Sequence, residues 1–138
     1  MYFVTIDARE RRVMRENYTS LAGALEFMGL ENVDLGTASP GTGIIVSEFG
    51  LFEPVDKQHY FAIGNTLYGG NAVLYRYDES GIAVDVGPVP TITFFYGMEP
   101  IEAALKSGEV RRPQITLNGG VIWSWPDPAP EGFGPDAP

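Results

Sequence analysis

The chain has 138 residues, about the usual size of one domain, and 44% of them are hydrophobic, so a single hydrophobic core is expected. Eighteen Asp and Glu residues against nine Lys and Arg residues give a net charge of −9 at pH 7, which argues against a protein that binds the nucleic-acid backbone. The lack of cysteine excludes disulfides, thiolate metal sites and a cysteine nucleophile.

The N-terminal sequence MYFVTIDARERR carries its basic residues after the apolar segment, whereas a secretory signal carries them before it. No apolar run that follows is long enough to span a membrane. We therefore expect a cytoplasmic protein that makes no membrane contact.

The first half of the chain combines short extended segments with one helical pattern. Residues 2–6 alternate as a strand does, and the charged run over 9–16 predicts a turn or an exposed hairpin. Apolar residues at spacings of three and four predict a helix over 21–28, with Ser20 at its cap and Gly29 after its end. Residues 33–38 are expected to be extended, 39–43 to form a loop, and 43–50 to run from an extended segment into a turn.

The second half is richer in strand patterns. Strands are predicted over 59–63, 72–77, 82–86 and 91–97, and a short helix over 100–107. Alternating arms around Asn118-Gly119 predict a tight hairpin over 114–125, with Val121, Trp123 and Trp125 on one face. Segments 66–70 and 116–120 are similar and suggest two related hairpins, although coincidence of turn residues is the favoured interpretation.

These patterns predict an α+β fold, with a mainly antiparallel sheet of five to seven strands and two short helices. Residues 1–125 are expected to form a single compact domain, and the Pro- and Gly-rich residues 126–138 a flexible tail. The expected core residues are Val4, Ile6, Leu21, Leu25, Ile45, Val73, Tyr75, Ile92, Phe94, Ile115 and Trp123.

Little in the sequence suggests catalysis. His59 is the only histidine and Ser47 stands in no nucleophile motif, so a Ser-His-Asp triad is not indicated. Asp78, Glu79 and Asp85 lack the spacing of a calcium loop, and no Gly-rich phosphate loop is present. We therefore expect no enzymatic activity, no metal site and no cofactor.

The acidic residues concentrate in the middle of the chain, near predicted strand ends and turns. Such a field repels nucleic acid and attracts a basic protein surface, although solubility alone also explains it. A few of the many aromatic residues are expected to act as interface hot spots. The predicted partner-binding residues are Glu48, Glu53, Asp56, Asp78, Glu79, Asp85, Tyr68 and Tyr77.

Four features follow one another over residues 1–86: a strand, the helix in TSLAGALEFMGL, an acid-x-Gly-Leu turn starting at Glu48, and a Gly-Asn-x-Val segment starting at Gly70. This order resembles a family of small phage and mobile-element proteins, the domain of unknown function three-eight-four-six. The resemblance implies no catalytic residues. It implies a setting in which many accessory proteins bind a host factor, including inhibitors of CRISPR and restriction systems.

The leading hypothesis is a noncatalytic phage or mobile-element accessory protein. Its acidic surface would bind and inhibit a host defence or nucleic-acid-handling protein that has a basic surface, without direct contact to nucleic acid. The alternative is a small-molecule or nucleotide-signal binding module with an aromatic-lined pocket between sheet and helix, where a phosphate would rely on the run 9–15, on Arg76, or on Arg111 with Arg112. An enzyme built on acidic residues is a third and weaker hypothesis.

Overall fold

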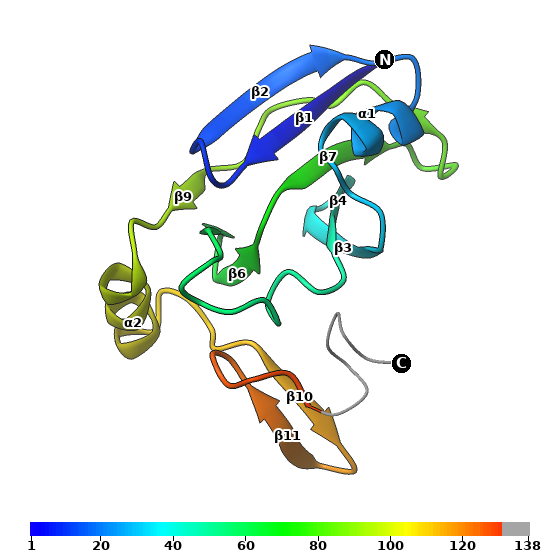
Figure 1. Cartoon of the computed structure of the whole chain (residues 1–138). Helices are drawn as coiled ribbons and strands as arrows, with labels where there is room; N and C mark the ends of the chain where they lie inside the picture. The colour runs from blue at the N-terminus through cyan, green and yellow to red at the C-terminus, as the bar shows by residue number, and fades with distance from the viewer. Residues whose placement is uncertain (131–138) are drawn as a thin grey trace.

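The computed structural model describes residues 1–130; residues 131–138 of the predicted tail lie outside the described residues. Within that range the chain forms two short helices and three antiparallel sheets (Figure 1). The predicted α+β class, with a mainly antiparallel sheet and two helices, is confirmed.

The largest sheet has the strand order β2-β1-β7-β4-β3, and β8 pairs with β7. Its strands are β1 (Tyr2–Asp7), β2 (Arg12–Asn17), β3 (Val33–Ser39), β4 (Thr42–Ser47), β7 (Ala72–Tyr77) and β8 (Ala83–Val84). The six strands agree with the predicted number. The charged run forms the hairpin that the sequence allowed, because β2 pairs with β1 along its whole length.

Helix α1 (Leu21–Phe27) covers one face of this sheet. It begins as predicted, because the Ser20 hydroxyl accepts a hydrogen bond from the Gly23 amide at 3.1 Å. Ala24 of the helix lies in one buried cluster with Phe3 of β1 and Val73 of β7. The helix therefore buries the side of β1 opposite to Val4, and both faces of that strand lie in the core.

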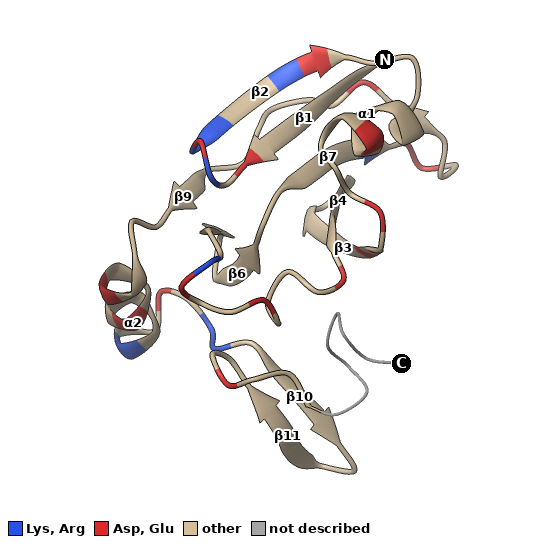
Figure 2. Ribbon diagram, in the orientation of Figure 1, with Lys and Arg blue, Asp and Glu red and all other residues tan. Residues whose placement is uncertain are grey.

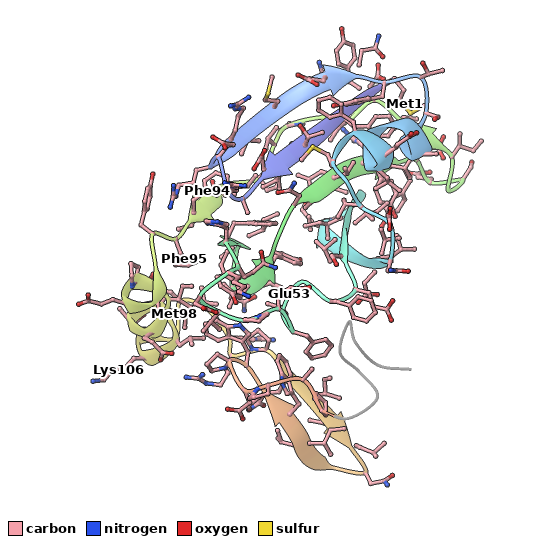
Figure 3. The ribbon with its side chains drawn as sticks, viewed as in Figure 1. Met1, Glu53, Phe94, Phe95, Met98 and Lys106 are labelled. Atoms are coloured by element: carbon pink, nitrogen blue, oxygen red, sulfur yellow. The ribbon has the colours of Figure 1, made fainter. Side chains whose placement is uncertain are left out.

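The other face of the large sheet is covered by a smaller sheet of order β6-β5-β9, formed by β5 (Tyr60–Ile63), β6 (Thr66–Gly69) and β9 (Ile92–Phe94). Phe61 and Ile63 of β5 lie in one buried cluster with Ile44 and Leu74 of the large sheet. Phe94 packs against this first cluster, whereas the next residue, Phe95, belongs to a second cluster on the far side of the small sheet (Figure 3).

The second cluster lies between the small sheet and an outer layer. That layer consists of α2 (Met98–Ser107) and the hairpin of β10 (Gln114–Leu117) and β11 (Gly120–Ser124). Tyr60 of β5 packs here with Ile101 of α2 and with Trp123 and Trp125. The hairpin turn has the predicted geometry, because Asn118 and Gly119 have φ angles of 51° and 81°.

Several local predictions differ from the structure. The strand expected over 91–97 is shortened to Ile92–Phe94, and the loop expected over 39–43 is a tight turn between β3 and β4. Strand β6, which pairs with β5, was not predicted: segment 66–70 contains it, whereas the similar segment 116–120 spans the turn between β10 and β11. The register of the β10–β11 hairpin shifts between Ile115 and Thr116, and Val121 is 55% exposed while Trp123 is buried. Strand β8 has two residues instead of the expected five.

Five of the expected core residues are buried, namely Val4, Ile6, Ile45, Val73 and Trp123. The other six are partly buried and pack against the three clusters. At the start of the predicted tail, the Trp123 indole N–H donates to the Asp127 carbonyl at 2.9 Å, which holds this segment against the hairpin.

Two glycines allow the loop after β4 to lie against β6. A methyl group on Gly69 would collide with the carbonyl oxygen of Gly50, and one on Gly50 would collide with that of Gly69. The two backbones are therefore closer than any side chain would permit.

We expect Gly69→Ala to lower the free energy of unfolding by roughly 2 kcal/mol, because a core position without free space is overpacked. The matched control is Gly120→Ala, whose methyl group would meet the Leu117 carbonyl oxygen at an ordinary 3.6 Å. This control should change stability by less than about 0.5 kcal/mol. Urea denaturation followed by tryptophan fluorescence measures both, and equal effects would argue against the close approach.

Candidate binding cleft

A cleft of about 820 Å³ lies between three parts of the fold that are distant in sequence. Its walls are the loop after β4 over residues 47–52, strand β6, and the segment that leads into β10 together with Trp123 of β11. In Figure 1 this region lies between β6 and the near end of the β10–β11 hairpin. Its size falls within the range of roughly 300–1,000 Å³ that is typical of small-molecule sites.

The loop wall is held by short-range hydrogen bonds. The Ser47 hydroxyl accepts from the Phe49 amide at 3.3 Å, and the Phe49 carbonyl accepts from the Phe52 amide at 2.9 Å. The Gln58 side-chain amide donates to the Gly50 carbonyl at 2.8 Å. These bonds keep Phe49 and Phe52 in the cleft wall.

Aromatic side chains from the loop, from β6 and from the hairpin line the cleft. The rings of Phe52 and Trp123 meet edge to face, with centroids 4.9 Å apart. The Tyr68 ring stacks on Phe61 of the first cluster at 5.2 Å. Burial raises the pKa of the Tyr68 phenol above its usual value, and a hydrogen bond with Thr66 acts in the opposite direction. Flat apolar surface and a few polar groups are the usual features of a ligand site.

Two arginines stand on the hairpin side of the cleft. Arg112 donates from Nη1 to the Trp125 carbonyl at 2.7 Å, and its Nη2 lies 3.7 Å from the Glu102 carboxylate. Arg111 is fixed by its main chain, which donates to the Asn65 carbonyl at 2.8 Å. Its exposed side chain makes no ion pair with any carboxylate of residues 1–130.

The structure divides the eight predicted partner-binding residues between two regions. Glu48, Glu53 and Asp56 lie on the loop after β4, on which Figure 3 labels Glu53, and Glu48 and Tyr68 line the cleft. Tyr77, Asp78, Glu79 and Asp85 lie around the turn from β7 to β8. Because β4 and β7 are antiparallel, the two regions stand at opposite ends of this pair, about 17 Å apart at ~3.4 Å per residue.

Two of the acidic residues have a structural task. The Asp78 carboxylate accepts from the amides of Ser80 and Ile82 at 2.9 and 3.0 Å and so closes the β7–β8 turn. The Asp85 carboxylate accepts from the Tyr2 amide at 2.9 Å and fastens the start of β1. The position of these two carboxylates is therefore explained by hydrogen bonds within the chain, and no binding partner is needed to explain it.

Figure 2 shows acidic positions on loops, on both helices and on the β1–β2 hairpin, and basic positions on that hairpin, on α2 and just before β10. Among the described residues, no three His, Asp or Glu side chains are grouped so that they could hold a metal ion. No helix within residues 1–130 is long and apolar enough to cross a membrane.

Sequence reasoning named Arg111, Arg112 and Tyr68 but not the cleft that unites them. It expected a pocket between sheet and helix, whereas this cleft is lined by the small sheet, a loop and the hairpin. The sequence did not indicate Phe49 and Phe52 as binding residues. Both lie in a loop, where no repeating pattern of hydrophobic residues shows which way a side chain points.

No family model, no characterised protein and no solved structure matches the chain. The resemblance to the phage family therefore stays a prediction.

Buried phenols predict how stability depends on alkaline pH. Burial raises the pKa of Tyr60 and of Tyr68, and burial together with a hydrogen bond to Glu16 raises that of Tyr18 to about 12. The unfolded chain loses these protons near pH ~10, before the folded protein does. We therefore expect the free energy of unfolding to fall as pH rises above about 10.

Urea denaturation at about pH 9, 10 and 11 tests this, with Tyr68→Phe as the comparison. The decline should be less steep in Tyr68→Phe, because one of the phenols with a raised pKa is gone. An equally steep fall of the unfolding free energy with pH in both proteins would mean that the Tyr68 hydroxyl is not buried in the folded protein.

Proposed function

We propose that the protein is a noncatalytic binding module whose cleft holds a small ligand with a flat ring and a negatively charged group, of the kind found in a mononucleotide. The observation that supports this most is a cleft of about 820 Å³ whose lining includes Phe49, Phe52 and Tyr68 together with Arg111 and Arg112. Aromatic faces bind a planar ring by stacking, and guanidinium groups suit phosphate oxygens.

The charges around the cleft favour one orientation of such a ligand. Asp34 and Glu48 line the side formed by β3 and the loop after β4, whereas Arg111 and Arg112 line the hairpin side. A phosphate therefore belongs on the hairpin side. Arg112 is already engaged by Glu102 and the Trp125 carbonyl, so Arg111 is the main anion-binding residue.

The proposal is tested with a panel of AMP, GMP, UMP and CMP. One of them should raise the Tm by several degrees at millimolar concentration, because a ligand that binds only the folded state stabilises it. Calorimetry then gives the Kd, and Arg111→Ala should raise it by about tenfold through the loss of a charge-assisted hydrogen bond.

The matched control is Arg9→Ala, which removes an exposed arginine from the turn of the β1–β2 hairpin, outside the cleft lining. It should leave the Kd unchanged. Flat melting curves for all four nucleotides, or equal losses in the two variants, would argue against a nucleotide-type ligand in this cleft.

A second function is favoured by the unpaired acidic residues. We propose that the protein also fits the role of a phage or mobile-element inhibitor that binds a basic host protein. Among residues 1–130 only Glu102 forms an ion pair, so the field of the other described carboxylates is not cancelled by neighbouring cations. Glu53 and Glu79 are chosen to test one residue from each acidic region, because neither makes a structural hydrogen bond of the kind that Asp78 and Asp85 make.

Charge reversal tests this second function. Glu53→Lys and Glu79→Lys should weaken the capture of a host defence or DNA-handling protein, and the captured protein should leave as NaCl rises from about 0.1 to 0.5 M. Glu10→Lys, an exposed change in the turn of the β1–β2 hairpin and outside both regions, controls for net charge. Capture that resists both salt and the two substitutions would contradict an electrostatic interface.

A further inference from the structure

The acidic and basic walls of the cleft meet strand β6 near its opposite ends. The loop after β4 meets β6 at Gly69, because Gly50 of that loop lies directly against this residue. The segment before β10 meets the other end, where the Arg111 amide donates to the carbonyl of Asn65, the residue before β6. The two ends of β6, Thr66 and Gly69, are about 10 Å apart at ~3.4 Å per residue. The two walls can therefore contact opposite ends of one ligand.

Glu48 supplies the uncommitted carboxylate of the acidic wall. It follows β4 directly, and its main-chain amide donates to the Asn32 carbonyl at 2.8 Å, which fixes its backbone. It is exposed and lines the cleft, and within residues 1–130 its carboxylate forms no ion pair and accepts no hydrogen bond. Asp34 lines the same wall, but one of its oxygens accepts from the Leu35 amide at 3.0 Å. Glu48 therefore has both oxygens available for a ligand.

The chemistry of a carboxylate restricts the base that it can recognise. An ionised carboxylate has two oxygens that accept hydrogen bonds and no donor, so its best partner is an edge with two neighbouring donors. Among the bases of AMP, GMP, UMP and CMP, only guanine has such an edge, formed by N1–H and the 2-amino group. The other three bases place an acceptor beside each donor, and a carboxylate repels that acceptor.

We propose that the ligand of the cleft is a guanine nucleotide and that Glu48 recognises the N1–H and 2-amino group of its base. The base stacks on the aromatic side chains of the lining, and the phosphate extends along β6 to Arg111. Asp34 beside Glu48 strengthens the preference for donors at this end of the cleft. This inference rests on the proposed function and adds the residue that determines base specificity.

A comparison of GMP with IMP tests the contact on the ligand, because IMP lacks only the 2-amino group. Calorimetry should give a Kd for GMP at least about tenfold lower than for IMP, through one additional hydrogen bond to a charged group. AMP, UMP and CMP should also bind at least about tenfold more weakly than GMP. Equal Kd values for GMP and IMP, or tighter binding of any other base, would overturn guanine recognition while the cleft remains a nucleotide site.

Glu48→Gln tests the contact on the protein. Its side-chain amide keeps one accepting oxygen and turns the other into a donor, so the Kd for GMP should rise about tenfold. The preference for GMP over IMP should fall below about threefold, a ratio that a general loss of folded protein would leave unchanged.

The matched control is Glu53→Gln, which removes the same charge from the same loop at a residue outside the cleft lining. Loss of a negative charge alone favours an anionic ligand, so this variant should bind GMP at least as tightly as the unmodified protein. Equal weakening in the two variants, or an unchanged preference for GMP over IMP in Glu48→Gln, would overturn the role of Glu48. If no nucleotide binds the unmodified protein, the proposed function and this inference both fail.

Discussion

The burial of both faces of the small β6-β5-β9 sheet is the constraint on which the rest of the structure depends. Successive residues of β5 point to opposite sides, so Phe61 and Ile63 enter the first cluster while Tyr60 and Ala62 enter the second. One four-residue strand thus joins the large sheet to α2 and the β10–β11 hairpin. Without it, the outer layer of α2 and the hairpin would have no contact with the first cluster, because the two clusters have no residue in common.

The cleft follows from the same arrangement. The chain crosses from β4 to β5 through a loop. On its way from α2 to β10 it passes the start of β6, where the Arg111 amide donates to the Asn65 carbonyl. Gly50 and Gly69 allow the loop after β4 to touch β6, and the Arg111 amide holds the segment before β10 against the Asn65 carbonyl, just before β6. A small opening remains between aromatic residues that belong to three separate segments.

The sequence predicted the parts of the fold that depend on local pattern. Helix α1, strand β7 and the Asn118-Gly119 hairpin each carry their signal within a few residues, and each is present. Strand β6 was missed because TLYG is short and bounded by glycines, and its strand character comes from pairing with β5. The cleft could not be predicted for the same reason. Tyr68, Phe49 and Arg111 come together only through sheet order, which no local pattern records.

Charge counting predicted the sign of the surface but not which cations are free to bind an anion. Arg11 lies over the Tyr96 ring at 3.8 Å and Arg15 over the Tyr2 ring at 4.2 Å, and Arg15 also donates to the Val86 carbonyl at 3.4 Å. Arg11 therefore holds the β1–β2 turn to the segment after β9, and Arg15 holds β2 to β1 and to the segment after β8, in both cases through a cation–π contact. Arg112 is likewise held by Glu102. The side chain of Arg111 has neither role and lines the aromatic cleft, so it is a better candidate for binding an anion than the other arginines named here.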